Sequence, residues 1–244
     1  GDAIGYPSEY IEYVRNTGGD AIAFTEHGNM SSFPHYYLYT EKLNKQGVNF
    51  KSIPGIEAYF ISSLTDWRVL YEKKKEDKKL KISEIAENEG EATSYEVEEE
   101  TKKFSDDPIK HRNHLVLLAK TQKGINNLFA TVSKSYKHGF FKYPRVDFDL
   151  LKEHREDVVC LSGCIAGPFS YAIMKLTHEN KSFDEIQNAL LNMTDRFIDV
   201  FGSENFFYEI QFNKLEQQHK LNEHLIKLSK KTGIKLVATN DAHY

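Results

Sequence analysis

The sequence has few cysteines and no long hydrophobic run. Only Cys160 and Cys164 occur among its 244 residues, and the opening stretch GDAIGYPSEY lacks the basic and apolar regions of a signal peptide. No segment approaches the ~20 consecutive apolar residues that a membrane-spanning helix needs. We therefore expect a protein of a reducing, cytoplasmic setting that does not insert into a membrane.

Several common binding and catalytic patterns are also missing. The net charge of −4 provides no overall basic field, so nucleic acid would have to bind at a local patch. The chain has neither a G-x-G-x-x-G nor a G-x-x-x-x-G-K-[ST] loop, which excludes NTP hydrolysis of the P-loop type. The stretch LSGCIAG around Cys164 lacks the pattern of a nucleophile elbow, and a free cysteine is usually a small buried hydrophobic residue. Nucleophilic catalysis therefore has little support.

What the sequence does contain is an alternation of short apolar runs with segments of helical period. The runs are AIAF from Ala21, IEAYFI from Ile56, HLVLLA from His114, DVVCLSG from Asp157, NFFYEIQ from Asn205 and IKLVATND from Ile234. Helices are expected at residues 8–17, 36–46, 121–136, 183–200 and 215–231, several of them closed by glycine. This alternation predicts an α/β fold around a largely parallel sheet, in a single domain of residues 1–244.

Residues 71–107 interrupt this pattern. The stretch YEKKKEDKKLK is basic and EIAENEGEATSYEVEEE is acidic, and neither has enough apolar residues to build a core. We interpret 71–107 as an inserted, mobile segment. Its basic half could contact phosphates, although charge runs are usually solvated surface.

Ionisable residues follow several of the predicted strands. Glu26 and His27 come after AIAF, Cys164 comes after DVVCLSG, and Asp241 and His243 lie in TNDAHY. Loops after the strands of a parallel barrel gather functional residues at one face, and side chains two apart on a strand point to the same side. Aspartate and histidine suit Zn²⁺, Mn²⁺ or Fe²⁺, so Asp241 and His243 indicate either a metal site or a capped turn.

A carboxylate and an imidazole lie on two further apolar runs, Glu57 in PGIEAY and His114 in RNHLVLLA. His114 stands at the start of its run, where the barrel rule predicts no ligand. Taken singly, each residue is more often a satisfied polar group of the core or part of a surface ion pair. Their functional interpretation therefore depends on the other candidates.

Seven stretches of the chain together resemble the PHP (polymerase and histidinol phosphatase) domain family. They are AIAFTEHGNMSSF, PGIEAY, RNHLVLLAKTQKGINNL, YPRVDFDLL, CLSGCIAG, FFYEIQ and KLVATNDAHY, in the family's order over nearly the whole chain except the charged segment. The resemblance is closest to the PHP domain that opens the alpha subunit of bacterial DNA polymerase III. It implies a distorted (βα)7 TIM-like barrel with a charged insertion, in agreement with the alternation above.

The resemblance also implies a metal centre, because PHP domains hold up to three divalent metal ions with nine residues. Seven positions of this chain match ligands of the family: Asp2, His27, Glu57, His114, Cys164, Asp241 and His243. Glu57 matches the carboxylate that bridges two metals, and Asp241 and His243 match the closing D-x-H pair. Zn²⁺, Mn²⁺ or Fe²⁺ fits this set, and the thiol of Cys164 favours Zn²⁺.

Two features depart from the family pattern. PHP domains open with an H-x-H pair on the first strand, and nothing before Asp2 supplies it. Either the chain begins inside that strand or the strand comes from elsewhere, and we expect the 244 residues on their own to bind metal incompletely and to have weak or no activity. Glu26 stands where the family has Asp before the His; it keeps the charge, and we expect it to orient a ligand. Tyr244 is expected to be a domain boundary, because polymerase domains follow this motif in the family.

The activity that the resemblance implies is metal-dependent hydrolysis of a phosphodiester, namely 3′–5′ exonuclease proofreading on DNA. Asp241, His243 and Glu57 would hold the catalytic metals, which generate hydroxide near neutral pH. The implied partners are DNA, polymerase domains of the same subunit and a proofreading exonuclease. Two alternatives stay open: a non-catalytic platform that stabilises the polymerase and docks that exonuclease, and a small-molecule phosphatase of the histidinol phosphate type.

Three more residues are candidates for a supporting role. Lys142 and Arg145 in FFKYPRVD would steady a phosphate or else be ordinary solvated side chains. Glu209 in FFYEIQ lies in a run that should line the barrel. It would be an inner-face partner of a metal ligand or a member of a structural ion pair.

Overall fold

The computed structural model describes residues 5–87 and 107–242. In this part of the chain, eight strands form one sheet: β1 Ala21–His27, β2 Lys51–Phe60, β3 Asn113–Ala119, β4 Phe140–Phe141, β5 Tyr143–Val146, β6 Val158–Leu161, β7 Phe206–Gln211 and β8 Leu236–Thr239. The helices are α1 Pro7–Asn16, α2 Phe33–Lys45, α3 Leu64–Glu87, α4 Gln122–His138, α5 Phe148–Glu153, α6 Pro168–His178, α7 Phe183–Phe201 and α8 Glu216–Thr232. The protein is therefore an α/β fold in which strands and helices alternate, as the sequence predicts.

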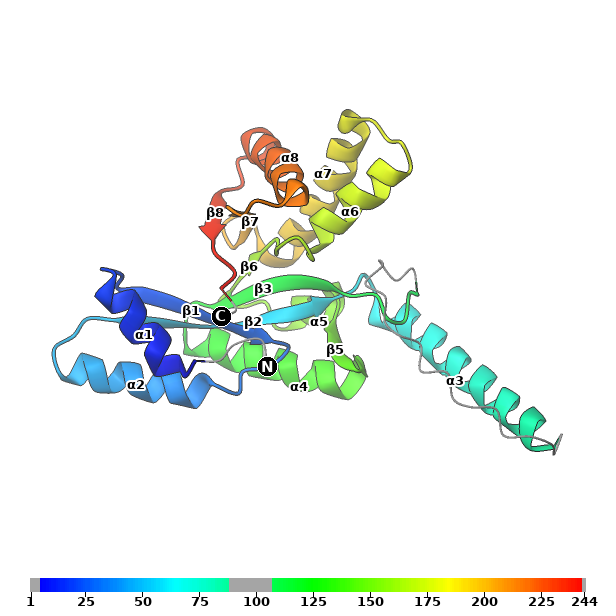
Figure 1. The fold of residues 1–244 in the computed structure, drawn as a ribbon, viewed down its shortest axis with the longest axis horizontal. Coiled ribbons are helices and arrows are strands. Elements are labelled where there is room, and N and C mark those ends of the chain that lie inside the picture. Colours follow the sequence, from blue (N-terminus) through cyan, green and yellow to red (C-terminus); the bar gives the residue numbers. More distant parts are fainter. Residues whose placement is uncertain (1–4, 88–106, 243–244) are drawn as a thin grey trace.

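The sheet has the strand order β4-β5-β2-β3-β6-β7-β8, and β1 pairs with β2. It curls, so that β6–β8 with α6–α8 lie above the layer formed by β1–β3 with α1, α2 and α4 (Figure 1). Such a curled sheet with helices on its outside agrees with the distorted barrel that the sequence predicts. The two ends of the curl face each other across its interior.

Strand direction is less uniform than the sequence suggests. The pairings of β1 with β2, β2 with β5, β6 with β7 and β7 with β8 are parallel. However, β3 runs antiparallel to both of its neighbours, β2 and β6. Consequently the first residues of β3 lie at the same edge of the sheet as the last residues of β2. This reversal decides where His114 is located.

The main core is built by aromatic side chains between the sheet and α7. Along α7 the buried residues recur every three or four positions, which places them on one face of the helix. Phe197 lies at the centre of this face, fully buried. Its ring centroid is 5.5 Å from that of Phe60, 5.0 Å from that of Phe148 and 5.1 Å from that of Phe206. A smaller core of Ile11, Tyr36, Leu43 and Phe50 joins α1 and α2 to the edge of the sheet.

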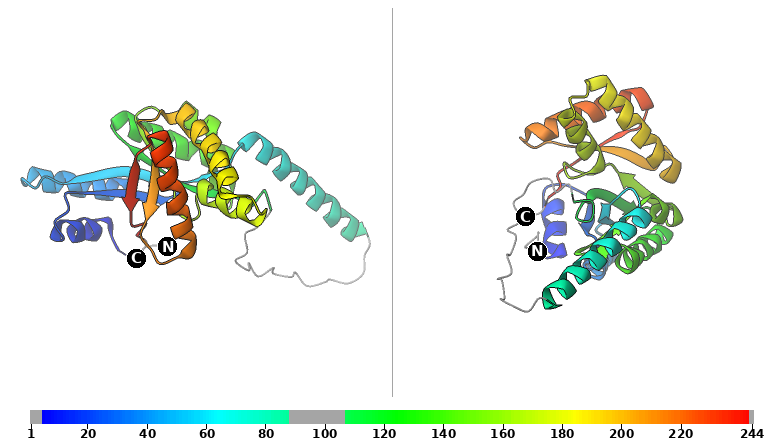
Figure 2. Two further views of the ribbon diagram at one scale, coloured as in Figure 1. Left: turned by 90° about the horizontal axis from the view of Figure 1, so that it is seen from above. Right: turned by 90° about the vertical axis from the view of Figure 1, so that its right-hand side faces the viewer.

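The charged segment begins as a helix. Its basic half continues α3, which starts at Leu64 and projects from the body of the molecule (Figures 1 and 2). Trp67 anchors the first turns of α3, since it is buried and its indole Nε1 donates a hydrogen bond to the carbonyl of Ile109 at 3.1 Å. Residues 88–106 lie outside the described part, so the predicted mobility of the insert stays a prediction. No described helix has the length and apolar character that crossing a membrane requires.

We expect Phe197→Ala to lower the free energy of unfolding by about 3–5 kcal/mol, because it removes a buried ring and leaves a cavity among three others. Phe212→Ala is the matched control, since the Phe212 side chain is 78% exposed and should cost no more than about 0.5 kcal/mol. Urea unfolding of both variants measures the difference. Equal losses would show that α7 does not pack on the sheet as described.

Candidate metal centre

Three strands bring together two histidines and a glutamate. In the register of the sheet, His27 at the end of β1 is opposite Glu57 of β2, and His114 near the start of β3 is opposite Tyr59 of β2. Side chains two apart on a strand share a face, so Glu57 and Tyr59 both point toward the same side of the sheet. The reversed direction of β3 therefore places His114 beside the ends of β1 and β2, where the simple barrel rule did not predict it.

Glu57 is the centre of this cluster. Its Oε2 atom lies 2.5 Å from Nε2 of His27, and its Oε1 atom lies 3.1 Å from Nδ1 of His114. The residue is 4% exposed. Burial raises the pKa of the Glu57 carboxyl, but the hydrogen bonds and positive charge of His114 and His27 outweigh this effect and lower the pKa to about 2. Glu57 is therefore a carboxylate throughout the physiological pH range.

Cys164 approaches the cluster from the loop after β6. Its Sγ atom is 3.9 Å from Oε1 of Glu57 and 3.9 Å from Nδ1 of His114. Burial raises the pKa of the Cys164 thiol, and the negative charge of Glu57 raises it further. Both Cys160 and Cys164 are unpaired thiols, so Cys164 is free to act as a ligand once its proton is lost.

A glycine allows this approach. Gly163 has φ +83°, which favours glycine, and a Cβ atom there would lie only 2.2 Å from the carbonyl oxygen of His114. On the other side of the loop, the His114 amide donates a hydrogen bond to the carbonyl of Ala166 at 2.9 Å. The sequence SGC thus provides the close contact that holds Cys164 against β3.

Glu209 in β7 and Asp241 after β8 add negative charge near the cluster. Glu209 is 3% exposed, and its Oε1 atom accepts hydrogen bonds from Oγ1 of Thr239 at 2.5 Å and Nε2 of Gln211 at 3.3 Å. Its Oε2 atom is buried and has no hydrogen-bond partner. Burial raises the pKa of the Glu209 carboxyl, and although Thr239 and Gln211 lower it, the charges of Asp241 and Glu57 add to the increase. The charge of Asp241, an exposed residue after β8, also contributes to raising the pKa of Cys164.

The donor set of this site fits a divalent cation. Two imidazoles, a thiol and the buried Glu57 carboxylate converge, and no Lys or Arg in residues 5–87 or 107–242 forms a salt bridge with Glu57 or Glu209. A buried carboxylate is costly without a cation or hydrogen-bond donors, and Oε2 of Glu209 is buried without a hydrogen-bond partner. One donor atom from each of His27, Glu57 and His114 lies within 4.8 Å of the others. Nitrogen, oxygen and sulfur donors of this kind suit Zn²⁺, Mn²⁺ or Fe²⁺.

The predicted ligands thus fall into two groups. His27, Glu57, His114 and Cys164 are brought together, and Asp241 affects them through its charge; the binding of metal by all five stays a prediction. Asp2 and His243 lie outside the described residues.

Glu26 binds the loop that follows His27 rather than the cluster. It precedes His27 on β1 and therefore points to the opposite side of the strand. Its carboxylate accepts hydrogen bonds from the amide and the hydroxyl of Ser32, at 2.9 Å and 2.7 Å. Its predicted role in orienting a ligand is thus indirect at most, through the loop between β1 and α2.

The sequence predicted that Arg145 is exposed, either as a phosphate contact or as a solvated side chain, and the structure instead buries it. It is 1% exposed, and its guanidinium donates hydrogen bonds to the carbonyls of Phe141 at 2.8 Å, Tyr143 at 3.0 Å and Ile109 at 2.8 Å. These bonds fasten the β4–β5 hairpin to the chain before β3, so Arg145 is structural and not accessible to a phosphate. Lys142 is exposed in the hairpin turn with φ +60°, and its phosphate contact stays a prediction.

Sequence reasoning missed the residues that support the cluster. Ser162 accepts a hydrogen bond from the Glu209 amide at 2.9 Å, and Thr239 and Gln211 bind the Glu209 carboxyl. Gln211 lies two residues after Glu209, and Tyr59 lies two residues after Glu57. The period of two along a strand was the signal that could have identified both.

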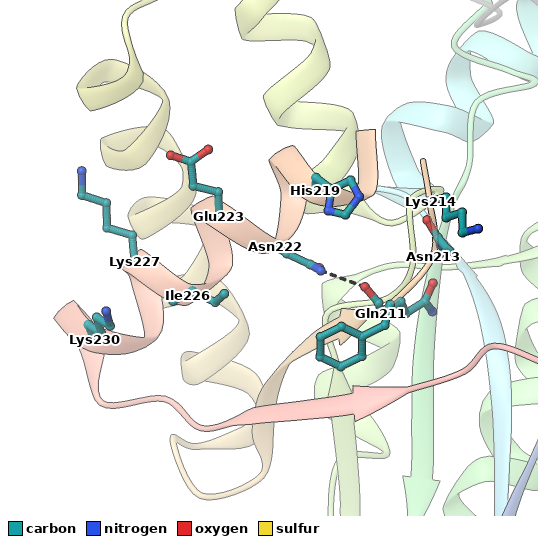
Figure 3. Close-up of a pocket in the computed structure, with 10 residues that line it drawn as sticks. Gln211, Asn213, Lys214, His219, Asn222, Glu223, Ile226, Lys227 and Lys230 are labelled. Atoms are coloured by element: carbon teal, nitrogen blue, oxygen red, sulfur yellow. Dashed lines mark hydrogen bonds between the residues drawn. The ribbon is translucent and has the colours of Figure 1, made fainter. Parts of the chain in front are cut away.

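A groove of about 890 Å³ adjoins the site at Gln211 (Figure 3). It is formed by the loop after β7 and the outer face of α8, and Asn222 of α8 donates a hydrogen bond to the Gln211 carbonyl at 2.8 Å. Its residues are Gln211, Phe212, Asn213, Lys214, His219, Asn222, Glu223, Ile226, Lys227 and Lys230. None of the histidines or carboxylates of the cluster lines it, so it is a surface beside the site and not the site itself.

The chain is similar to known proteins along nearly its whole length. It is 31% identical over 237 residues to the DNA polymerase III subunit alpha of Aquifex aeolicus and 32% identical over 237 residues to that of Borreliella burgdorferi. Each match covers 97% of this chain but 16% of the relative. The subunit from Treponema pallidum is 28% identical over 235 residues, which cover 96% of this chain and 16% of the relative.

A family model matches most of the chain as well. The model of the PHP domain matches residues 1–213, which include His27, Glu57, His114, Cys164 and Glu209. The histidine, glutamate and cysteine that the fold brings together thus lie within the matched region. The chain therefore belongs to the PHP domain family.

Proposed function

We propose that this chain is the metal-dependent phosphodiesterase domain of a replicative DNA polymerase subunit and that, within the intact subunit, it removes nucleotides from the 3′ end of DNA. The observation that carries this proposal is the buried group of His27, Glu57 and His114 with the Cys164 thiol beside it. The relatives, DNA polymerase III alpha subunits, support DNA and polymerase domains as its partners. This chain spans only 16% of their length, so the activity of the whole subunit is part of the proposal.

The residues of the site have distinct roles in this reaction. Divalent metal ions supply a nucleophilic hydroxide near neutral pH and positive charge for the phosphate oxygens. Glu57, held as a carboxylate between two imidazoles, presents one oxygen to each of them and would hold a metal ion through that charge. His27 and His114 would bind the ion as neutral imidazoles, so metal and protons compete for the same ring nitrogens. Asp241 and His243 complete the proposed set, with Asp2 as a further ligand.

Zn²⁺ is the ion that the described ligands favour. A thiolate is a soft ligand that prefers Zn²⁺ to Mn²⁺ or Mg²⁺. Because burial and Glu57 raise the pKa of Cys164, its proton leaves only when a cation takes its place. Unpaired Cys160 and Cys164 are consistent with the reducing cytoplasm in which we place the protein.

Glu57→Gln should abolish both metal binding and nucleotide release, because the amide keeps the shape of the side chain but loses its charge. In the intact subunit, we expect the rate of nucleotide release from a 5′-labelled single-stranded DNA to fall by at least about a hundredfold, since even outer partners of a metal site cost up to that much. Glu216→Gln is the matched control, because Glu216 is exposed on α8 and pairs only with Lys220. Undiminished release by the Glu57 variant would refute the metal mechanism.

The same measurement separates the alternative function. If the wild-type chain binds metal stoichiometrically but releases no nucleotide from DNA or phosphate from small phosphate esters, the domain is a structural platform. Release from small esters alone indicates a phosphatase of small molecules.

The two cysteines provide a further matched test. Cys164→Ser should weaken Zn²⁺ binding by at least about tenfold and Mn²⁺ binding less, because a hydroxyl replaces a soft ligand. Cys160→Ser should leave both affinities unchanged, since the Cys160 thiol is buried within β6 and points to the carbonyl of Leu161. Competition with a chromophoric chelator measures both constants. Equal Zn²⁺ affinities of the two variants would exclude Cys164 as a ligand.

A further inference from the structure

We propose that Arg112 binds a phosphate group of the substrate beside the metal centre. This inference rests on the proposed function, because it supplies the phosphate contact for a phosphodiester held at the metals. The ligand is a phosphate monoester or diester, such as the terminal nucleotide of a DNA strand. The proposal stands on the position of the Arg112 guanidinium, on its unused hydrogen-bond donors and on the positive charge around it.

The position of Arg112 is fixed by two tyrosine rings. Its Cζ atom lies 3.7 Å from the ring centroid of Tyr143 and 5.4 Å from that of Tyr59. The Tyr59 ring in turn lies 5.4 Å from the imidazole of His114 and 6.2 Å from that of His27. The guanidinium and the two histidines of the cluster therefore contact the same buried ring. A planar cation stacked on an aromatic face is held in a defined orientation.

The guanidinium has hydrogen-bond donors that the protein does not use. Arginine has five N–H donors, yet the bond that Arg112 makes is a long one from Nη1 to the carbonyl of Lys110, at 3.4 Å. Its Nε atom is buried and has no hydrogen-bond partner. No carboxylate of the described residues forms a salt bridge with Arg112. By contrast, Arg145 makes three short bonds to carbonyls, so the two arginines have different roles.

Positive charge is concentrated at this point. Burial lowers the pKa of Arg145, and together with the charge of Arg112 brings it to about 10. Burial lowers the pKa of His111 as well, and although Asn113 raises it, Arg145 and Arg112 add to the decrease. Two guanidinium groups are thus close together without a described counterion. An anion with several oxygens can neutralise them, and the fork of Arg112 matches a phosphate with two parallel hydrogen bonds.

Binding of dTMP to the Mn²⁺-loaded chain tests this role without turnover. We expect Arg112→Met to raise the dissociation constant for dTMP, measured by calorimetry, about ten- to a hundredfold, which is the range for hydrogen bonds to a charged group. Arg112→Lys should give an intermediate value, because it keeps the charge and loses the fork. Metal affinity should not change in either variant. Arg155→Met is the matched control, since exposed Arg155 also donates to a nearby carbonyl, that of Lys152 at 2.9 Å.

An unchanged dissociation constant in Arg112→Met would overturn the proposal. If that variant does not fold, the wild-type chain supplies the answer through modification by phenylglyoxal: dTMP should slow the reaction of Arg112 and not that of Arg155, and equal rates with and without dTMP would overturn it. The proposed function is refuted by a different result. Absence of nucleotide release from DNA refutes the phosphodiesterase, whereas dTMP binding still reports whether Arg112 holds a phosphate.

Discussion

The ion pairs of Glu57 with two histidines are the interaction on which this site depends. A carboxylate that is almost fully buried is costly unless charged or polar partners surround it, and here His27 and His114 outweigh the cost of burial, so that the pKa of Glu57 is lowered. The partners come from three different strands. The register of β1, β2 and β3 therefore places both partners of Glu57 beside its carboxylate. The same strand register that forms the sheet also keeps Glu57 charged.

The same constraint explains the direction of β3. A parallel β3 would carry its first residues to the far edge of the sheet and would remove His114 from Glu57. In the antiparallel arrangement, His114 lies at the edge where β1 and β2 end, and its own amide bonds to Ala166 of the loop that carries Cys164. Gly163 is required at this contact, because any Cβ atom would collide with the His114 carbonyl. One strand thus fixes both an imidazole and the thiol next to it.

The sequence predicted six of the eight described strands, five of the helices and the group of ionisable residues at the strand ends, because each depends on local periodicity or on residue type; it missed the short strands β4 and β5. It did not predict the direction of β3, since an apolar run such as HLVLLA has the same pattern in either direction. It also failed for Arg145, where burial depends on the carbonyls of Phe141, Tyr143 and Ile109 that converge only in the folded chain. The helical start of the charged segment was missed because composition indicates solvation but not local backbone structure, and Trp67 anchors it from outside the charged run.

The charged side chains near Tyr59 fall into two sets of opposite sign. One set consists of the carboxylates of Glu57, Glu209 and Asp241, which add to the effect of burial in raising the pKa of the Cys164 thiol and so favour a cation. The other set consists of Arg112 and the buried Arg145, whose positive charges favour an anion. A phosphodiester bound to metal ions needs both, because its oxygens contact the cations while its remaining charge faces outward. The buried Tyr59 ring contacts both sets, since it lies near the Arg112 guanidinium as well as the imidazoles of His27 and His114, so one aromatic side chain helps to position the groups for the cation and the group for the anion.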